Sequence, residues 1–77
     1  MTIKKVNLEK IKRLRKAKGL SFNQMAEKLG YESQNGYYYL ETGRNKFSAE
    51  ALAMVATIFN VPIEDLFFED KVTKMAN

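Results

Sequence analysis

The sequence of 77 residues contains neither cysteine nor histidine. The chain therefore has no disulfide framework, lacks the commonest zinc ligands and cannot form a Ser-His or Cys-His nucleophile pair. Lys, Asp, Glu and Tyr can also support catalysis, but no acid/base or metal-binding constellation of these residues is evident. We therefore expect no catalytic residue, no metal and no cofactor, and an enzyme is the least expected class.

Long apolar runs are also missing. No stretch of 18 apolar residues occurs, and the lysines of residues 1–6 are not followed by an apolar segment. Neither a membrane span nor a secretory signal peptide is therefore predicted. The lack of cysteine fits any compartment, and with no leader evident we expect a cytoplasmic protein. The length predicts one domain, covering residues 1–77, near the lower size at which an apolar core holds a fold.

The charged residues are distributed unevenly along the chain, whose net charge is +4. Residues 1–18 carry eight Lys and Arg against a single Glu, and residues 19–46 carry three charges of each sign. Residues 47–77 carry two basic and five acidic residues. The first segment would attract a polyanion, although charged helix faces are also common in small proteins that bind no polyanion. Charge alone leaves both interpretations open.

Apolar periodicity and capping residues predict short helices joined by tight turns. The expected helices span about residues 7–18, 22–29, 34–42, 49–59 and 62–68. Suitable N-caps precede the first four: Asn7, Ser21, Ser33 and Ser48. Ser21 and Gln24 also have the spacing of a capping box. The sequence therefore predicts an all-α fold, with residues 69–77 frayed.

Two of these helices, 22–29 and 34–42, flank the four-residue break GYES. This is the layout of a helix-turn-helix, although generic helix pairs share it. The segment IKRLRKAKGLSFNQMAEKLG resembles the first two helices of the Cro and phage-repressor-like helix-turn-helix family. The segment YYYLETGRNKFSAEALAMVATIFNVPIEDLF resembles the rest, so the match covers about residues 7–68. The resemblance implies a compact five-helix bundle of the lambda-repressor type, which the xenobiotic-response-element family shares.

In this family the second helix of the pair enters the major groove of DNA, and residues near its start reach base edges. Helical geometry agrees, because turning Tyr37, Leu40 and Glu41 toward the body leaves the other side of the helix outward. The candidate base contacts are Gln34, Asn35, Tyr38 and Tyr39. Gln and Asn suit the major-groove edge of adenine, and tyrosine rings can contact thymine methyl groups. The alternative is that Gln34 and Asn35 are simply polar residues in the first turn of this helix and bind no ligand.

Candidate phosphate contacts lie at helix starts and in the loop after the second helix of the pair. They are Asn23, Ser33, Thr42, Arg44, Asn45 and Lys46. Phe22 departs from the family pattern, because many relatives have a Gln there that binds a phosphate and braces the recognition helix. Gly36 departs from ordinary helix design, since glycine in a helix costs about 1 kcal/mol relative to alanine. Either a close approach or a tolerant helix start would explain this glycine.

The resemblance also implies an ion pair between Arg15 and Glu41, partly buried, that fixes the angle of the recognition helix. Such proteins usually bind palindromic sites as twofold dimers. The acidic and apolar C-terminal region is the expected dimer surface, with Ile63, Phe67 and Phe68 as candidates. Phe67 is also expected in the core, from the Leu-Phe motif of the family.

We therefore expect a sequence-specific regulator of transcription that binds double-stranded DNA, a repressor of the phage, plasmid or restriction-control type. It would bind a palindromic operator as a homodimer, and neither a membrane nor a small-molecule ligand is indicated. Two alternatives stay open. An antitoxin-type regulator would keep this fold and also bind a toxin protein, whereas a helical interaction adaptor would not be retained on duplex DNA.

Overall fold

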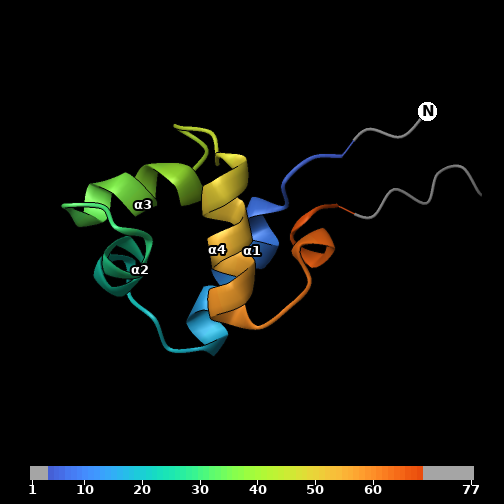
Figure 1. Ribbon diagram of the computed structural model, residues 1–77, viewed down its shortest axis with the longest axis horizontal. Coiled ribbons are helices and arrows are strands. Elements are labelled where there is room, and N and C mark those ends of the chain that lie inside the picture. Colours follow the sequence, from blue (N-terminus) through green and yellow to red (C-terminus); the bar gives the residue numbers. More distant parts are fainter. Residues whose placement is uncertain (1–3, 69–77) are drawn as a thin grey trace, which may run out of the picture.

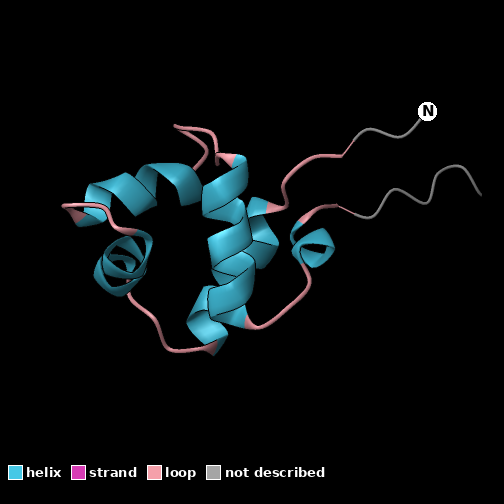
Figure 2. Ribbon diagram, in the orientation of Figure 1, coloured by secondary structure: helices cyan, strands magenta, loops and turns pink. Residues whose placement is uncertain are grey.

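The computed structural model describes residues 4–68. They form four α-helices, α1 (Leu8–Ala17), α2 (Phe22–Leu29), α3 (Gln34–Glu41) and α4 (Ala49–Phe59), and then the 3-10 helix η1 (Ile63–Leu66) (Figure 1). This part of the chain contains no β-strand (Figure 2), only an isolated antiparallel bridge between Val6 and Phe67. The expected all-α fold is confirmed, with four α-helices and a 3-10 helix in place of five helices.

The α-helices begin at the residues expected to cap them, and three of these caps are made by side chains. Asn7, Ser21 and Ser48 each accept a hydrogen bond from the backbone N–H three residues later, at 3.0–3.1 Å. The side chain of Gln24 accepts in turn from the N–H of Ser21 at 2.8 Å, which completes the capping box. Ser33 stands at the N-cap of α3, but its side chain makes no capping hydrogen bond. The short helix α3 must therefore be held by tertiary contacts.

The last element differs from the α-helix predicted over residues 62–68. The 3-10 helix stops at Leu66, and the backbone then pairs with the segment before α1. The N–H of Asn7 donates to the carbonyl of Leu66 at 2.8 Å, and the N–H of Phe68 donates to the carbonyl of Lys5 at 2.9 Å. Because these backbone groups form hydrogen bonds with the segment before α1, they are not available for the hydrogen bonds of a longer helix. Residues 69–77, expected to be frayed, lie outside the described residues.

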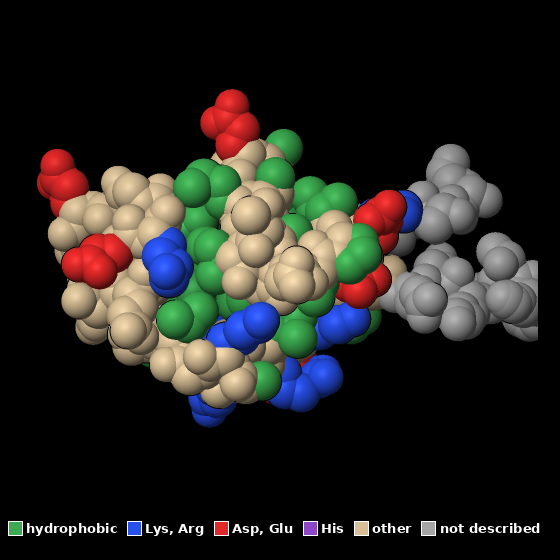
Figure 3. Space-filling view, turned by 60° about the horizontal axis from the view of Figure 1, so that its bottom comes forward, with side chains coloured by type: hydrophobic (Ala, Val, Ile, Leu, Met, Phe, Trp, Pro, Cys, Tyr) green, Lys and Arg blue, Asp and Glu red, His purple; other side chains and the backbone are tan. Residues whose placement is uncertain are grey.

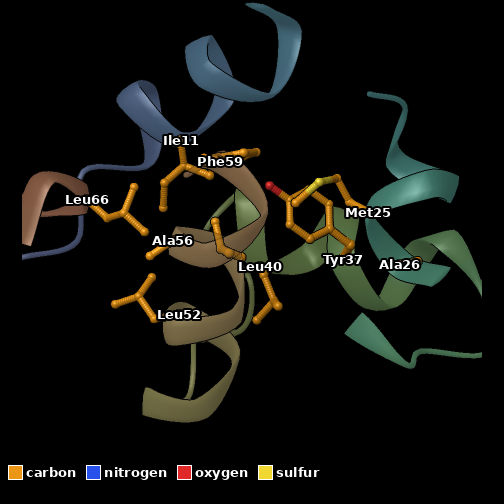
Figure 4. Close-up of a cluster of buried hydrophobic side chains, with 10 residues drawn as sticks. Ile11, Met25, Ala26, Tyr37, Leu40, Leu52, Ala56, Phe59 and Leu66 are labelled. Atoms are coloured by element: carbon orange, nitrogen blue, oxygen red, sulfur yellow. The ribbon is translucent and has the colours of Figure 1, made fainter. Parts of the chain in front are cut away.

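Buried side chains of α1 and α4 belong to one core cluster, with α2 and α3 packed on each other at one end of the molecule and η1 at the other (Figure 1). The largest fully buried side chains come from all five elements: Ile11, Met25, Tyr37, Val55, Phe59 and Leu66. Figure 4 shows the ring of Tyr37 beside Met25, where α3 meets α2. Tyr37 therefore ties the helix pair to the common core.

Gly36 is explained by the close approach of Tyr31 from the turn between α2 and α3. A Cβ atom at position 36 would lie 2.7 Å from Cγ and 2.9 Å from Cβ of Tyr31. Carbon atoms do not pack at such distances, because their optimal separation is about 3.5–4.0 Å. Glycine lets the turn fold tightly against the first turn of α3, which offsets its cost in helix propensity.

Candidate nucleic-acid interface

Arg15 and Glu41 form an ion pair in the interior between α1 and α3, and each residue is 7% exposed. Arg15 Nε donates to Glu41 Oε2 at 2.8 Å, and Nη2 donates to Oε1 at 3.1 Å. Arg15 Nη1 donates to the backbone carbonyl of Leu20 at 2.8 Å. Two parallel hydrogen bonds fix the guanidinium and carboxylate planes relative to each other. The last residue of α3 is thereby held on α1.

Tyr37 supplies a further hydrogen bond to this pair. Its hydroxyl donates to Glu41 Oε2 at 2.8 Å, one turn along α3. Desolvation of the buried phenol raises the pKa of Tyr37 far above its ordinary value of 10.0, and the hydrogen bond to Glu41 raises it further. Within residues 4–68, no buried side-chain nitrogen or oxygen lacks a hydrogen-bond partner. The cluster is therefore fully satisfied, with Tyr37 as a neutral donor.

The raised pKa of Tyr37 predicts a loss of stability in alkali. Above pH about 10 the unfolded chain releases the Tyr37 proton while the folded chain keeps it, so the folded state binds more protons. The free energy of unfolding should then fall by up to about 1.4 kcal/mol per pH unit from this group alone. Urea unfolding of the wild type and of Tyr37→Phe from pH ~9 to ~11 measures the effect. The stability difference between the two proteins should shrink steadily; a constant difference would contradict the buried donor.

The other side of α3 faces solvent. Gln34 and Asn35 are exposed in its first turn, and Tyr38 is 40% exposed. Tyr39, which was expected on the outward side of the helix, is half-buried. Its ring contacts that of Tyr38, with centroids 5.9 Å apart, and the Arg44 guanidinium carbon lies 4.8 Å from its centroid. Three of the four candidate base contacts are thus exposed, and the fourth is half-buried.

The six candidate phosphate contacts are all exposed: Asn23, Ser33, Thr42, Arg44, Asn45 and Lys46. The loop after α3 folds back on that helix, because the N–H of Asn45 donates to the carbonyl of Tyr39 at 3.0 Å. The hydroxyl of Thr42 donates to the carbonyl of Tyr38 at 2.9 Å. These bonds keep the loop close to the exposed side of α3, where it adds two positive charges.

Three contributors to this site were missed by the sequence reasoning. They are the carbonyl of Leu20, the hydroxyl of Tyr37 and the ring of Phe22, whose centroid lies 4.3 Å from the Arg15 guanidinium carbon. The spacing of Tyr37 and Glu41, four residues apart on a helix, could have indicated the second contact. The other two depend on how α1 meets α2, which no local pattern of the sequence encodes.

The candidate dimer residues lie at the end of the molecule opposite α2 and α3 (Figure 1). Ile63 is 37% and Phe68 is 54% exposed, whereas Phe67 is half-buried against the core. Figure 3 shows the molecule with the lower side of Figure 1 turned forward, and apolar side chains occupy the middle of the face in view. Lys and Arg lie mostly in the lower half of this view, and Asp and Glu lie at its top and toward both ends, where basic side chains are also found.

Two other kinds of site are not found among residues 4–68. They contain no group of three or more acidic, Cys or His side chains placed to hold a metal ion. None of their helices combines the length and the apolar character needed to cross a membrane.

Comparison with known proteins supports the resemblance seen in the sequence. A helix-turn-helix family model matches residues 11–66. The chain is also 34% identical over 71 residues to the HTH-type transcriptional regulator AnsR of Bacillus subtilis (strain 168). That match covers 92% of this chain and 60% of the relative, so the chain spans about three fifths of the relative's length. No solved structure shows significant similarity to this chain. The chain belongs to the helix-turn-helix family of the Cro and C1 type.

Proposed function

We propose that this protein is a sequence-specific regulator of transcription, a repressor that binds double-stranded DNA through α3. The observation that carries the proposal is the division of α3 into two sides. Tyr37 and Glu41 anchor one side in the core, and Gln34 and Asn35 present amides to solvent on the other. Amides can make the paired hydrogen bonds that identify adenine in the major groove. A rigidly held helix keeps these groups in one geometry.

The basic character of the chain supports the same proposal. Arg44 and Lys46 lie in the loop beside α3, and lysines and arginines crowd the exposed side of α1. The loop residues would contact phosphates directly, whereas the charge of α1 would raise attraction at longer range. We place the protein in the cytoplasm, where its target DNA would be accessible.

A homodimer on a palindromic operator completes the proposal. One recognition helix reads only a few base pairs. A twofold dimer would read two such half-sites, with centres about one helical turn of DNA apart. Ile63 and Phe68 are the exposed apolar candidates for the interface, at the end of the molecule away from α3. Phe67 would act through the core, because its ring is half-buried there.

Selection of bound duplexes from a random pool tests the function directly. We expect an enriched palindrome with half-sites about 10 base pairs apart, and affinity that falls steeply as salt rises. An enriched site without twofold symmetry would contradict the proposed dimer but would still support sequence-specific DNA binding. Failure to enrich any sequence at moderate salt would contradict the proposal that the protein is a sequence-specific regulator.

A further inference from the structure

Five side chains form a continuous run of ring and cation contacts from α1 to the loop after α3. The Arg15 guanidinium carbon lies 4.3 Å from the centroid of the Phe22 ring. The Phe22 and Tyr38 centroids are 5.1 Å apart with nearly perpendicular rings, at 82°. Tyr38 contacts Tyr39 at 5.9 Å, and the Arg44 guanidinium carbon lies 4.8 Å from the Tyr39 centroid. The buried ion pair is thus linked by rings to the exposed side of α3.

Phe22 is the member that connects the interior to the surface. It is the first residue of α2 and is half-buried, and it contacts the buried Arg15 as well as the exposed Tyr38. Cations are attracted to the face of an aromatic ring, and two rings at this distance prefer an edge-to-face arrangement. Both contacts therefore constrain the orientation of the Phe22 ring, which in turn restricts that of Tyr38.

We propose that Phe22 is a specificity-determining positioning residue, which holds the Tyr38 ring in the orientation that reads a base pair. This inference rests on the proposed binding of DNA by α3. Phe22 need not touch DNA; it acts by limiting the rotamers of Tyr38, whose exposed ring would otherwise be restricted by the contact with Tyr39 alone. A side chain fixed before binding loses less conformational entropy in the complex and discriminates better between base pairs.

The substitution Phe22→Leu tests this role because leucine keeps apolar cover over Arg15 but has no ring to contact Tyr38. We define the base pair read by Tyr38 as the one whose preference is lost in Tyr38→Ala. At that base pair Phe22→Leu should lower discrimination about three- to tenfold, the loss expected for one aromatic contact. Discrimination at other base pairs and affinity for unrelated duplex should stay the same. The double variant should discriminate no worse than Tyr38→Ala alone.

Two controls separate positioning from a general loss of structure. Phe22→Tyr keeps the ring and should keep the preference of the wild type, and thermal melting shows whether each variant is folded. In the free protein, NMR couplings about the Tyr38 Cα–Cβ bond should report one rotamer in the wild type and averaging in Phe22→Leu. The ring contacts of Phe22 are with Tyr37 and Tyr38, so Tyr31 should show no change.

The possible failures are distinguishable. If the wild type enriches no duplex, the DNA-reading role of Tyr38, and with it that of Phe22, is overturned together with the proposed function. If the wild type selects a site and folded Phe22→Leu keeps full discrimination, only the role of Phe22 is overturned. A uniform loss of affinity for all duplexes would likewise overturn it, because that is the effect of a purely structural residue.

Discussion

The substitution Glu41→Ala should lower the free energy of unfolding by about 3–5 kcal/mol, the range for removing one partner of a buried ion pair. The loss arises because Arg15 would keep its charge in the interior without the carboxylate that now accepts two of its hydrogen bonds. The hydroxyl of Tyr37 would lose its acceptor as well. Small domains are stable by only about 5–15 kcal/mol, so the change should be visible in urea unfolding and in thermal melting.

Two comparisons isolate the buried charge as the cause. Glu27→Ala removes a carboxylate from an exposed position of α2 and should change stability by no more than about 0.5 kcal/mol. The double variant Arg15→Leu and Glu41→Leu removes both charges and should be less destabilised than Glu41→Ala, because no ion is left unpaired. A loss below about 1 kcal/mol for Glu41→Ala would mean that the pair does not hold α3 in place.

Local chemistry explains why much of the fold could be predicted from the sequence. A capping side chain acts on backbone groups three residues away, so the positions of Asn7, Ser21 and Ser48 are sufficient to locate three helix starts. Left-handed backbone at Gly30 and Asn60 ends α2 and α4 where the sequence places residues that tolerate it. Such signals need no knowledge of the rest of the molecule.

Features that depend on distant contacts could not be predicted in the same way. The segment after Leu66 is extended because its backbone pairs with residues before α1, and no pattern within 62–68 encodes that partner. The need for glycine at position 36 comes from the ring of Tyr31 across a turn. The Arg15–Glu41 contact spans 26 residues, and it was expected only through the family resemblance. Capping residues and apolar periodicity thus predicted the positions of the helices, whereas the family resemblance predicted the contact between α1 and α3.

The exposed amides at the start of α3 should control which DNA sequence is preferred. We expect Asn35→Ala to lower discrimination at particular base pairs of the selected site by about 1–3 kcal/mol per half-site, the range for one bidentate contact to a base. Gln34→Ala should act in the same way at a neighbouring base pair. Both residues are exposed and lie outside the core, so thermal stability should be nearly unchanged. Competition binding with duplexes altered at one base pair each measures the effect.

A phosphate contact should behave differently, and Lys46→Ala is the matched control. Arg44 is less suitable because its guanidinium lies over the ring of Tyr39, so Arg44→Ala would disturb a candidate base reader too. Lys46 is exposed in the same loop, and its loss should weaken binding to all duplexes alike and lower the salt slope by about one per protomer. If Asn35→Ala gave this uniform pattern instead, its amide would contact the DNA backbone, and base reading would fall to Gln34 and the tyrosines.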